Sequence, residues 1–398
     1  MFNKKTVEDI DVKNKKVIVR VDYNVPLDEN GNVTDNTRIR LSLPTLNYLL
    51  ERNAKIILMS HLGRPKGAVE EKYRLTPAAK ELEKLIGKPV KKFDETFSPE
   101  IKEYVDSKMQ FGEIIMLENL RFNSGEKSND KEFAKNLASL AEVYVDDAFG
   151  AAHRAHASIS GVAEFLPAVA GFLMKKEVEA LSALLEAPRR PFMAILGGSK
   201  VSDKILVIQN LLGKVDTLIL GGGMSYTFLK AQGYGIGKSI CEDDQVDYAK
   251  DMIELAKKNG VNFMLPVDLV IAKEYAKDAE RKNVSVDAIP SDWEGMGIGE
   301  KTTELYKAAI AKAKTIFWNG PVGVFEWENF EKGTKEVANA IAHSSAVTVV
   351  GGGDTLAAIK KYGLSDKFSH VSSGGGASME FLEGKVLPGV AVLMDKEN

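Results

Sequence analysis

Short apolar runs recur along the chain and indicate strands that are buried on both faces. In the first half these runs occupy residues 17–21, 56–59, 114–117 and 143–145. Helix starts separate them: Ser98 precedes Pro99, and Thr76 precedes Pro77, with Thr76 expected as an N-cap. Strands that alternate with helices and lack a polar face are typical of a parallel sheet covered on both sides. The pattern therefore predicts an α/β fold.

The second half repeats the pattern with a different kind of loop. Its apolar runs occupy residues 192–196, 217–220, 263–265, 315–318, 347–350 and 368–371. Five of the six lead into glycine-rich loops, which read GGSKVSDK, GGGMSYTF, NGPVGVFE, GGGDTLAAIKK and GGGASMEF. Glycine lets backbone N–H groups approach a ligand closely, and a helix start favours phosphate. This half is therefore expected to hold an anion with its backbone.

A single helix is expected between the halves, at residues 172–188. Met174, Val178, Leu181 and Leu185 fall on one helical stripe, and Pro188 ends the pattern. Only nine of the 34 glycines precede this helix. A chain of 398 residues also exceeds one comfortable core. The sequence therefore predicts two doubly wound, three-layer parallel-sheet domains joined by an interdomain helix.

Polar side chains follow the strands of the first half at the edge where open parallel sheets bind ligands. Alone, each arginine there would suit a surface salt bridge, and each histidine a satisfied loop residue. Their repeated placement at strand ends favours a socket for a small anion, because the guanidinium fork binds phosphate or carboxylate bidentately. Arg38 could reach the socket from a loop, and the residues just past the strands are Asp22, Asn24, His61, Arg64, Arg121 and Arg154.

In the second half, the residue of interest is Asp354, at a helix start in GGGDT. Two interpretations are open. The carboxylate could be an N-cap, or it could hold a Mg²⁺ ion that bridges phosphates. Lys200 and Lys204 lie four apart and could neutralise phosphate, although such a pair alone is usually a solvated face.

Composition and missing motifs exclude several classes. The net charge of −3 argues against nucleic acid as the main partner. The single cysteine, Cys241, excludes an internal disulfide and fits a reducing cytosol, and no apolar stretch predicts a signal peptide or membrane span. A dehydrogenase would need the absent GxGxxG fingerprint, and the near P-loop at 233–239 has Gln232 where glycine is required. A non-catalytic nucleotide-binding module would not need Arg38 and Lys204 as well as Asp354.

Eight segments in order resemble bacterial phosphoglycerate kinase. They are RVDYNVPL (20–27), SHLGRPKG (60–67), ENLRF (118–122), DDAFGAAHRAHAS (146–158), GGSKVSDK (197–204), GGGMSYTF (221–228), WNGPVGVFE (318–326) and GGGDT (351–355). They cover nearly the whole chain. Ser199, where many members have alanine, and Ser225-Tyr226 are mild departures.

The resemblance implies reversible transfer of a phosphoryl group from 1,3-bisphosphoglycerate to ADP, giving 3-phosphoglycerate and ATP, with Mg²⁺. It implies a cytoplasmic monomer with no membrane or nucleic-acid partner. Family members return their last residues to the first domain. The expected domains are therefore 1–171 plus about 379–398 for phosphoglycerate, and 189–378 for nucleotide.

The resemblance also assigns residues. Arg38, Lys204 and Gly375 are expected to be catalytic, and Asp354 to hold the metal. Substrate binding is assigned to Asp22, Tyr23, Asn24, Arg38, His61, Leu62, Gly63, Arg64, Arg121 and Arg154. Nucleotide binding is assigned to Gly198, Lys200, Lys204, Gly222, Gly295, Asn319, Glu326, Gly352, Gly353, Asp354 and Thr355. In the ATP-consuming direction the nucleophile is a carboxylate, already ionised at pH 7, so no general base is expected. Because the half-sites lie in different domains, hinge closure is expected.

Overall fold

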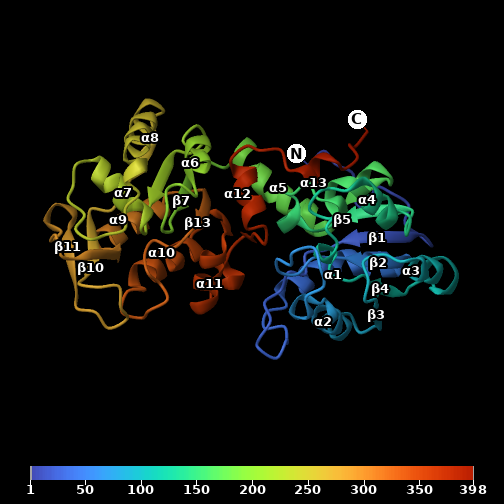
Figure 1. The fold of residues 1–398 in the computed structure, drawn as a ribbon. Helices are drawn as coiled ribbons and strands as arrows, with labels where there is room; N and C mark the ends of the chain where they lie inside the picture. Colours follow the sequence, from blue (N-terminus) through green and yellow to red (C-terminus); the bar gives the residue numbers. More distant parts are fainter. Residues whose placement is uncertain (1, 398) are drawn as a thin grey trace. The chain divides into compact units, whose positions relative to one another are not determined.

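The computed structural model describes residues 2–397, which form two compact units. Unit 1 runs to Glu179 and resumes at Val386, and unit 2 is Ala180–Lys385. Helix α5 (Phe172–Glu186) crosses the boundary in sequence, and Figure 1 shows it in green. Each unit contains a six-stranded, all-parallel sheet. The predicted fold class is confirmed.

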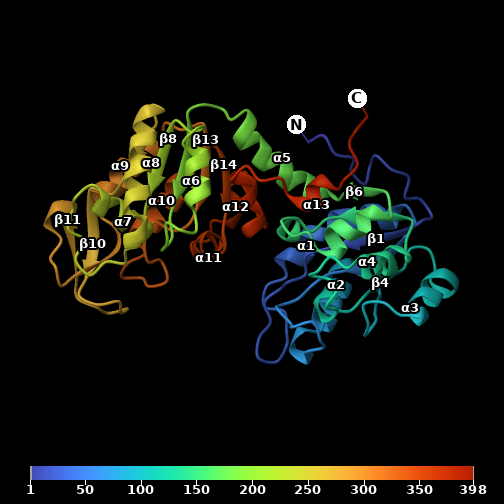
Figure 2. The same ribbon diagram turned by 45° about the horizontal axis from the view of Figure 1, so that its top comes forward.

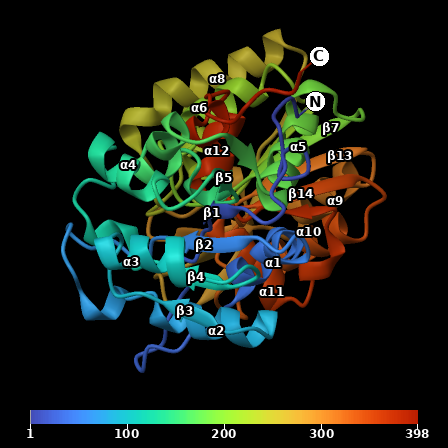
Figure 3. The same cartoon turned by 90° about the vertical axis from the view of Figure 1, so that its right-hand side faces the viewer.

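The sheet of unit 1 has the order β3-β4-β2-β1-β5-β6, and Figure 3 shows β1, β2, β4 and β3 following one another. Alternate strand residues, such as Val17 and Val19, join one core with helices α1 and α2. Figure 2 shows α4 passing in front of this sheet. The strands are β1 (Lys16–Arg20), β2 (Lys55–Met59), β3 (Val90–Lys92), β4 (Ile114–Met116), β5 (Val143–Asp146) and β6 (Ala168–Ala170). The helices are α1 (Thr37–Glu51), α2 (Thr76–Ile86), α3 (Pro99–Glu103), α4 (Lys131–Ala138) and α13 (Pro388–Ala391).

The sheet of unit 2 has the order β15-β14-β13-β7-β8-β9. Ile195, Ile316 and Trp318 pack on one of its faces. The strands are β7 (Phe192–Leu196), β8 (Thr217–Leu220), β9 (Asn262–Met264), β13 (Thr315–Asn319), β14 (Val347–Gly351) and β15 (His370–Val371). The helices are α6 (Ile205–Leu211), α7 (Met224–Ala231), α8 (Val246–Lys258), α9 (Glu300–Ile310), α10 (Lys332–Ala342), α11 (Gly353–Lys361) and α12 (Gly376–Leu382).

Unit 2 also contains a small antiparallel sheet that the sequence pattern did not predict. Its strands are β10 (Asp268–Ala272), β11 (Arg281–Ser285) and β12 (Glu294–Ile298), in the order β11-β10-β12. β11 reads RKNVS and is largely exposed, so it has no apolar run to reveal it.

Two local predictions were wrong. Helix α2 begins at Thr76 itself, so its N-cap is Leu75, which makes no side-chain cap. The Leu75 N–H instead donates to the buried Glu118 carboxylate at 3.0 Å, a distant partner that local sequence cannot show. Helix α5 ends at Glu186 rather than 188, because Ala187 precedes a proline and is biased away from helical geometry. On its stripe Leu184 is buried in place of Leu185, which is half-buried.

The start of α5 is fixed by side chains from elsewhere in unit 1. The backbone N–H groups of Leu173 and Met174 donate to Asp147 Oδ1 at 2.9 and 3.2 Å. The Phe172 N–H donates to Thr45 Oγ1 at 2.9 Å. Three of the N–H groups that a helix start leaves free are thereby satisfied. Asp147 is therefore the anchor for the first turn of α5.

Asp147 predicts a pH effect on stability. Burial raises the pKa of Asp147 to about 7, against about 3.9 in an unfolded chain. The folded state therefore holds an extra proton between these values. Its stabilisation is complete below about pH 4 and lost as the pH rises through about 7. We expect Asp147→Asn, which keeps an acceptor for the two N–H groups, to remove this loss.

Urea unfolding between about pH 4 and 8 measures the effect. The unfolding free energy of Asp147→Asn minus that of the wild type should rise with pH, with an upper limit on the order of 4 kcal/mol. The exposed Asp251→Asn serves as the control. Parallel pH curves for Asp147→Asn and the wild type would show that Asp147 titrates normally.

Candidate active site

Four segments of unit 1 meet beyond the carboxyl ends of the strands. Arg38 Nη1 lies 2.9 Å from Asp22 Oδ2, an ion pair between α1 and the residues after β1. Asn24 Oδ1 accepts from the Gly63 N–H at 2.9 Å. Arg121 Nη1 donates to the Gly63 carbonyl at 2.7 Å. The structure therefore brings these five predicted residues together.

Two further arginines at this edge are exposed. Arg64 and Arg154 make no side-chain hydrogen bond or ion pair within residues 2–397. Arg121 is half-buried, and its Nε has no partner among the same residues. Burial, followed by the neighbouring Arg20, lowers the pKa of the Arg121 guanidinium. Cationic side chains with unused donors are suited to receive an anion.

Two residues of the predicted set face away from such an anion. The Tyr23 phenol is buried and lies 2.7 Å from Ser42 Oγ, so the side chain belongs to the core. Leu62 is also buried. Contacts from Tyr23 or Leu62 to a ligand would have to come from the backbone. Successive side chains of an extended segment point to opposite sides. The motif around Tyr23 therefore contains both site-facing and core-facing side chains, and the motif alone does not tell them apart.

Asn119 was missed by sequence reasoning, although it orders the loop that carries His61 and Gly63. It is fully buried. Its Nδ2 donates to the Leu62 carbonyl at 2.7 Å and to the Tyr73 carbonyl at 2.8 Å. Its Oδ1 accepts from the N–H groups of Leu62 and Arg121 at 3.3 and 3.1 Å. One amide thus fixes the loop against the segment that bears Arg121.

We expect Asn119→Asp to be strongly destabilising despite its identical shape. A carboxylate oxygen would replace the donor that faces the carbonyls of Leu62 and Tyr73, leaving both buried acceptors unsatisfied. The free energy of unfolding in urea should fall by about 3 kcal/mol. The exposed Asn30→Asp adds the same charge without this contact. If both variants were equally stable, Asn119 would not have the ordering role that its contacts suggest.

In unit 2, a cavity of about 180 Å³ lies at the start of α11. Asn319 is buried, and its Nδ2 donor has no hydrogen-bond partner among the described residues. Gly352 is the N-cap, with a φ of +93°, and a Cβ there would lie 2.9 Å from that Nδ2. The cavity is lined by Gly197, Gly198, Ser199, Lys200, Asp203, Lys204, Asn319, Gly320, Gly352, Gly353, Asp354 and Thr355. Free helix N–H groups and an unused donor are features suited to a phosphate, and this cavity is called the cradle below.

Asp354 lies in the first turn of α11 but is not its cap. Gly352 holds that position, so the N-cap interpretation of Asp354 was wrong. The Asp354 carboxylate is exposed and forms no hydrogen bond or ion pair with any other described residue. Thr355, next to it, accepts from the Gly320 N–H through Oγ1 at 2.7 Å.

The two lysines of the cradle differ in environment. Lys204 is only 9% exposed, and its Nζ donates to the Asn319 carbonyl at 2.7 Å and to Asn319 Oδ1 at 2.6 Å. Burial lowers the pKa of Lys204 to about 7, against the opposing effect of Asp203 and Asp354. Lys200 is exposed. Sequence spacing alone had treated the two as equivalent.

A second cavity, of about 410 Å³, adjoins the cradle and shares Gly198, Ser199 and Asp354 with it. Gly222, Gly295 and Glu326, which the resemblance assigns to nucleotide binding, line it. A Cβ on Gly295 would lie 2.4 Å from the Tyr226 ring, so any other residue there would displace that ring. The predicted Gly375, with a φ of +50°, precedes α12 and lines neither cavity.

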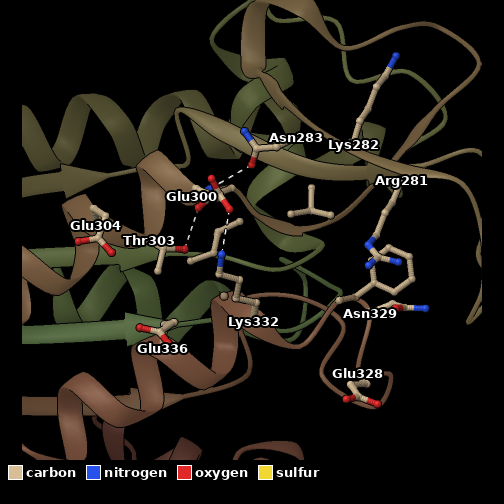
Figure 4. A pocket seen from close by; sticks show the side chains of 15 residues that line it. Arg281, Lys282, Asn283, Glu300, Thr303, Glu304, Glu328, Asn329, Lys332 and Glu336 are labelled. Carbon is tan, nitrogen blue, oxygen red and sulfur yellow. Dashed lines mark hydrogen bonds and ion pairs between the residues drawn. The ribbon is translucent and has the colours of Figure 1, made fainter.

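A third cavity in unit 2, of about 710 Å³, shares no residue with the other two. Figure 4 shows Glu300 between Asn283 and Lys332 on its wall. The Glu300 N–H donates to Asn283 Oδ1 at 3.1 Å, and Lys332 Nζ lies 2.9 Å from the Glu300 carboxylate. The wall carries both acidic and basic side chains, so it lacks the single sign of charge that a phosphate site needs.

Two negative findings hold for residues 2–397. No group of three or more His, Cys, Asp or Glu side chains is placed to ligate a metal by itself. No helix there is long and apolar enough to span a membrane.

Two α/β units, one with clustered arginines and one with a glycine-lined phosphate cradle, define an enzyme that handles phosphorylated small molecules. A family model described as phosphoglycerate kinase matches residues 7–385. The phosphoglycerate kinase of Coxiella burnetii is 44% identical, with a TM-score of 0.90 and 98% of each chain covered. That of Pyrococcus horikoshii OT3 is 33% identical, with a TM-score of 0.84 and 98% of each chain covered. The chain belongs to the phosphoglycerate kinase family, and it is a kinase of glycolysis.

Proposed function

We propose that the chain transfers a phosphoryl group reversibly between 1,3-bisphosphoglycerate and ADP, with phosphoglycerate held by unit 1 and nucleotide by unit 2. The observation that carries this division is the cradle of unit 2. It combines a helix start, the unpaired Asn319 Nδ2 donor and the buried Lys204. Unit 1 offers the complementary feature, a set of basic side chains for a smaller anion. We propose that the functional domains are those expected from the sequence, 1–171 plus about 379–398 and 189–378, with α5 as their connection.

In unit 1, Asp22 and Asn24 bind the hydroxyl and carboxylate end of the glycerate. Asp22 pairs with Arg38, and its carboxyl oxygens can accept from a hydroxyl. Arginine forks and imidazole donors bind the phosphate groups. The residues proposed for this role are Arg38, His61, Arg64, Arg121 and Arg154, with backbone contacts from Tyr23, Leu62 and Gly63.

In unit 2, the nucleotide phosphates occupy the cradle and the base occupies the adjoining cavity. Lys200, Asn319 and Thr355 approach the phosphates together with the N–H groups at Gly352 and Gly353. Glu326, exposed at the cavity wall, accepts from the ribose hydroxyls. The slot for the base is shaped by Gly198, Gly222 and Gly295.

Asp354 fits a Mg²⁺ ion carried by the nucleotide. Its carboxylate is exposed, unpaired and adjacent to the cradle. Mg²⁺ typically uses one or two carboxylates together with substrate phosphates and waters, so a single protein ligand suffices. When bound, the ion would neutralise charge on the nucleotide phosphates.

Phosphoryl transfer depends here on position and charge rather than on a general base. The nucleophile in the ATP-consuming direction is the ionised carboxylate of 3-phosphoglycerate. We assign Arg38 and Lys204 to the equatorial oxygens of the phosphoryl group in flight, with the N–H groups near Gly375. An arriving phosphate favours the charged form of Lys204, whose pKa of about 7 leaves it partly neutral beforehand.

The assignment of donor and acceptor to different units requires movement. The phosphoryl group must pass between them without water, yet both ligands must enter and leave. We propose hinge closure around the ends of α5 and near Gly374–Gly376. We further propose a cytoplasmic monomer, supported by the family and by the single cysteine.

A coupled assay of the purified protein tests the function. ADP formation from Mg-ATP should depend strictly on 3-phosphoglycerate and should stop when a chelator removes the metal. Tight binding of both ligands without turnover would instead favour a non-catalytic nucleotide-binding module. Turnover of ATP that is indifferent to 3-phosphoglycerate would overturn the proposed acceptor.

A further inference from the structure

Arg20, the last residue of β1, is a buried cation that the proposed mechanism does not use. It is 1% exposed and so cannot lie against a substrate as a surface arginine would. Its three nitrogens all have partners in unit 1. Nε lies 2.8 Å from Ser158 Oγ, Nη1 lies 2.5 Å from the Val21 carbonyl, and Nη2 lies 3.0 Å from His61 Nδ1. The guanidinium is therefore committed to neighbouring side chains.

The contact with His61 has only one possible direction. A guanidinium carries N–H donors and no acceptor. His61 Nδ1 must therefore accept, which means that it carries no proton. In a neutral imidazole the proton then resides on Nε2. Geometry alone thus selects one of the two tautomers.

A buried network holds Arg20 in this orientation. Ser158 Oγ donates to Glu126 Oε1 at 2.6 Å, and the Ser158 N–H donates to Glu126 Oε2 at 3.0 Å. Because the serine proton is used toward Glu126, its oxygen is free to accept from Arg20 Nε. Glu126 is fully buried, so its carboxylate has no competing water contact. The direction of both hydrogen bonds is thereby fixed: Arg20 donates to Ser158, and Ser158 donates to Glu126.

The surroundings of His61 also oppose a second proton. His61 is 6% exposed, and the charged or titratable groups facing it are Arg20, Arg121, Arg38 and His156. Burial, and then the positive charge of the neighbouring arginines, places the pKa of His61 well below its usual value. A neutral ring in this socket is the consistent state.

We propose that Arg20 is a positioning residue that fixes His61 as the neutral Nε2–H tautomer, so that His61 meets the substrate anion as a hydrogen-bond donor and not as a cation. The identity of that anion rests on the proposed function, whereas the tautomer does not. The arginines then provide the charge, and His61 provides a directional bond. That bond keeps its form throughout the neutral pH range.

Nitrogen-15 NMR of the intact protein labelled in its histidines tests the tautomer directly. Comparison with His61→Gln assigns the His61 ring. Near pH 7 we expect an unprotonated Nδ1 and a protonated Nε2, with or without 3-phosphoglycerate. A proton on Nδ1, or on both nitrogens, would overturn the proposal. This measurement needs no turnover. The tautomer proposal can therefore fail while the proposed function stands, and the proposed function can fail while the tautomer proposal stands.

The nitrogen-15 signals of the His61 ring in the Arg20→Lys variant test the role of Arg20. Lysine keeps the charge but loses the planar fork, so the His61 tautomers should mix or exchange. An unchanged signal would remove Arg20 from the proposal. Should Arg20→Lys fail to fold, Ser158→Ala frees Arg20 Nε and gives the same reading.

Two substitutions at His61 test which ring nitrogen donates to the substrate. The amide nitrogen of glutamine reaches about as far as Nε2, whereas that of asparagine stops near Nδ1. We expect His61→Gln to raise the KM for 3-phosphoglycerate less than His61→Asn does, because the glutamine amide can still donate from the Nε2 position. His61→Asn should raise it about 10- to 100-fold, the loss of a hydrogen bond to a charged group. The opposite order would contradict an Nε2–H donor.

Discussion

Asp354→Asn should lower kcat/KM for the Mg-nucleotide on the order of 100-fold, the scale of one lost charge-stabilising group. The amide retains the size of the side chain but loses the negative charge that a metal ion requires. Because Gly352 and not Asp354 is the N-cap of α11, no capping bond is broken. The free energy of unfolding should therefore stay within about 0.5 kcal/mol of the wild-type value.

Steady-state kinetics at limiting Mg²⁺ measure this effect most sharply, because excess metal could mask a weakened site. The exposed Asp366→Asn is a matched control on the segment after α11. Wild-type turnover by Asp354→Asn under these conditions would mean that the residue holds no metal.

Arg38→Ala and Lys204→Ala should each lower kcat about 100-fold, with a smaller change in KM. Contacts made mainly in the transition state behave in this way, and one such contact is worth on the order of 3 kcal/mol. Arg64→Ala should instead raise the KM for 3-phosphoglycerate, because the phosphate that we assign to Arg64 is not the one transferred. Arg40→Ala, an exposed position on the same helix as Arg38, is the control.

The two alanine variants need separate stability measurements. Removing Lys204 leaves Asn319 Oδ1 without a donor, although the Asn319 carbonyl still accepts from the Gly197 N–H. Removing Arg38 leaves Asp22 without its ion pair. Kinetics should therefore be compared at temperatures where each variant remains folded. Should all three substitutions change KM alone, the distinction between transferred and spectator phosphate would be lost.

The sequence anticipated the sheets because their strands are apolar on both faces. It also anticipated the glycine loops, since Gly198, Gly222 and Gly352 have positive φ values that other residues rarely adopt. These are local properties. The antiparallel sheet of unit 2 was missed because β11 reads RKNVS, a polar edge without an apolar run.

The supporting residues of the site could not be predicted because their partners lie far away in the chain. Arg20 bonds to Ser158, 138 residues later, and Asn119 reaches back 57 residues to Leu62. An arginine within the apolar run of β1 was a usable signal, since a buried cation must be paired. The spacing of Lys200 and Lys204 did not show that only Lys204 is buried, because burial depends on the fold.

Small-angle X-ray scattering tests the central claim, that phosphoglycerate and nucleotide are held by different units which close during transfer. Four samples are compared: the free protein, each binary complex and the complex with 3-phosphoglycerate plus a Mg-nucleotide. Only when both ligands are bound does each unit gain contacts with the ligand held by the other unit. The radius of gyration should therefore fall most in that sample. An unchanged radius there, with turnover intact in the same buffer, would place the transfer within one unit and contradict the account.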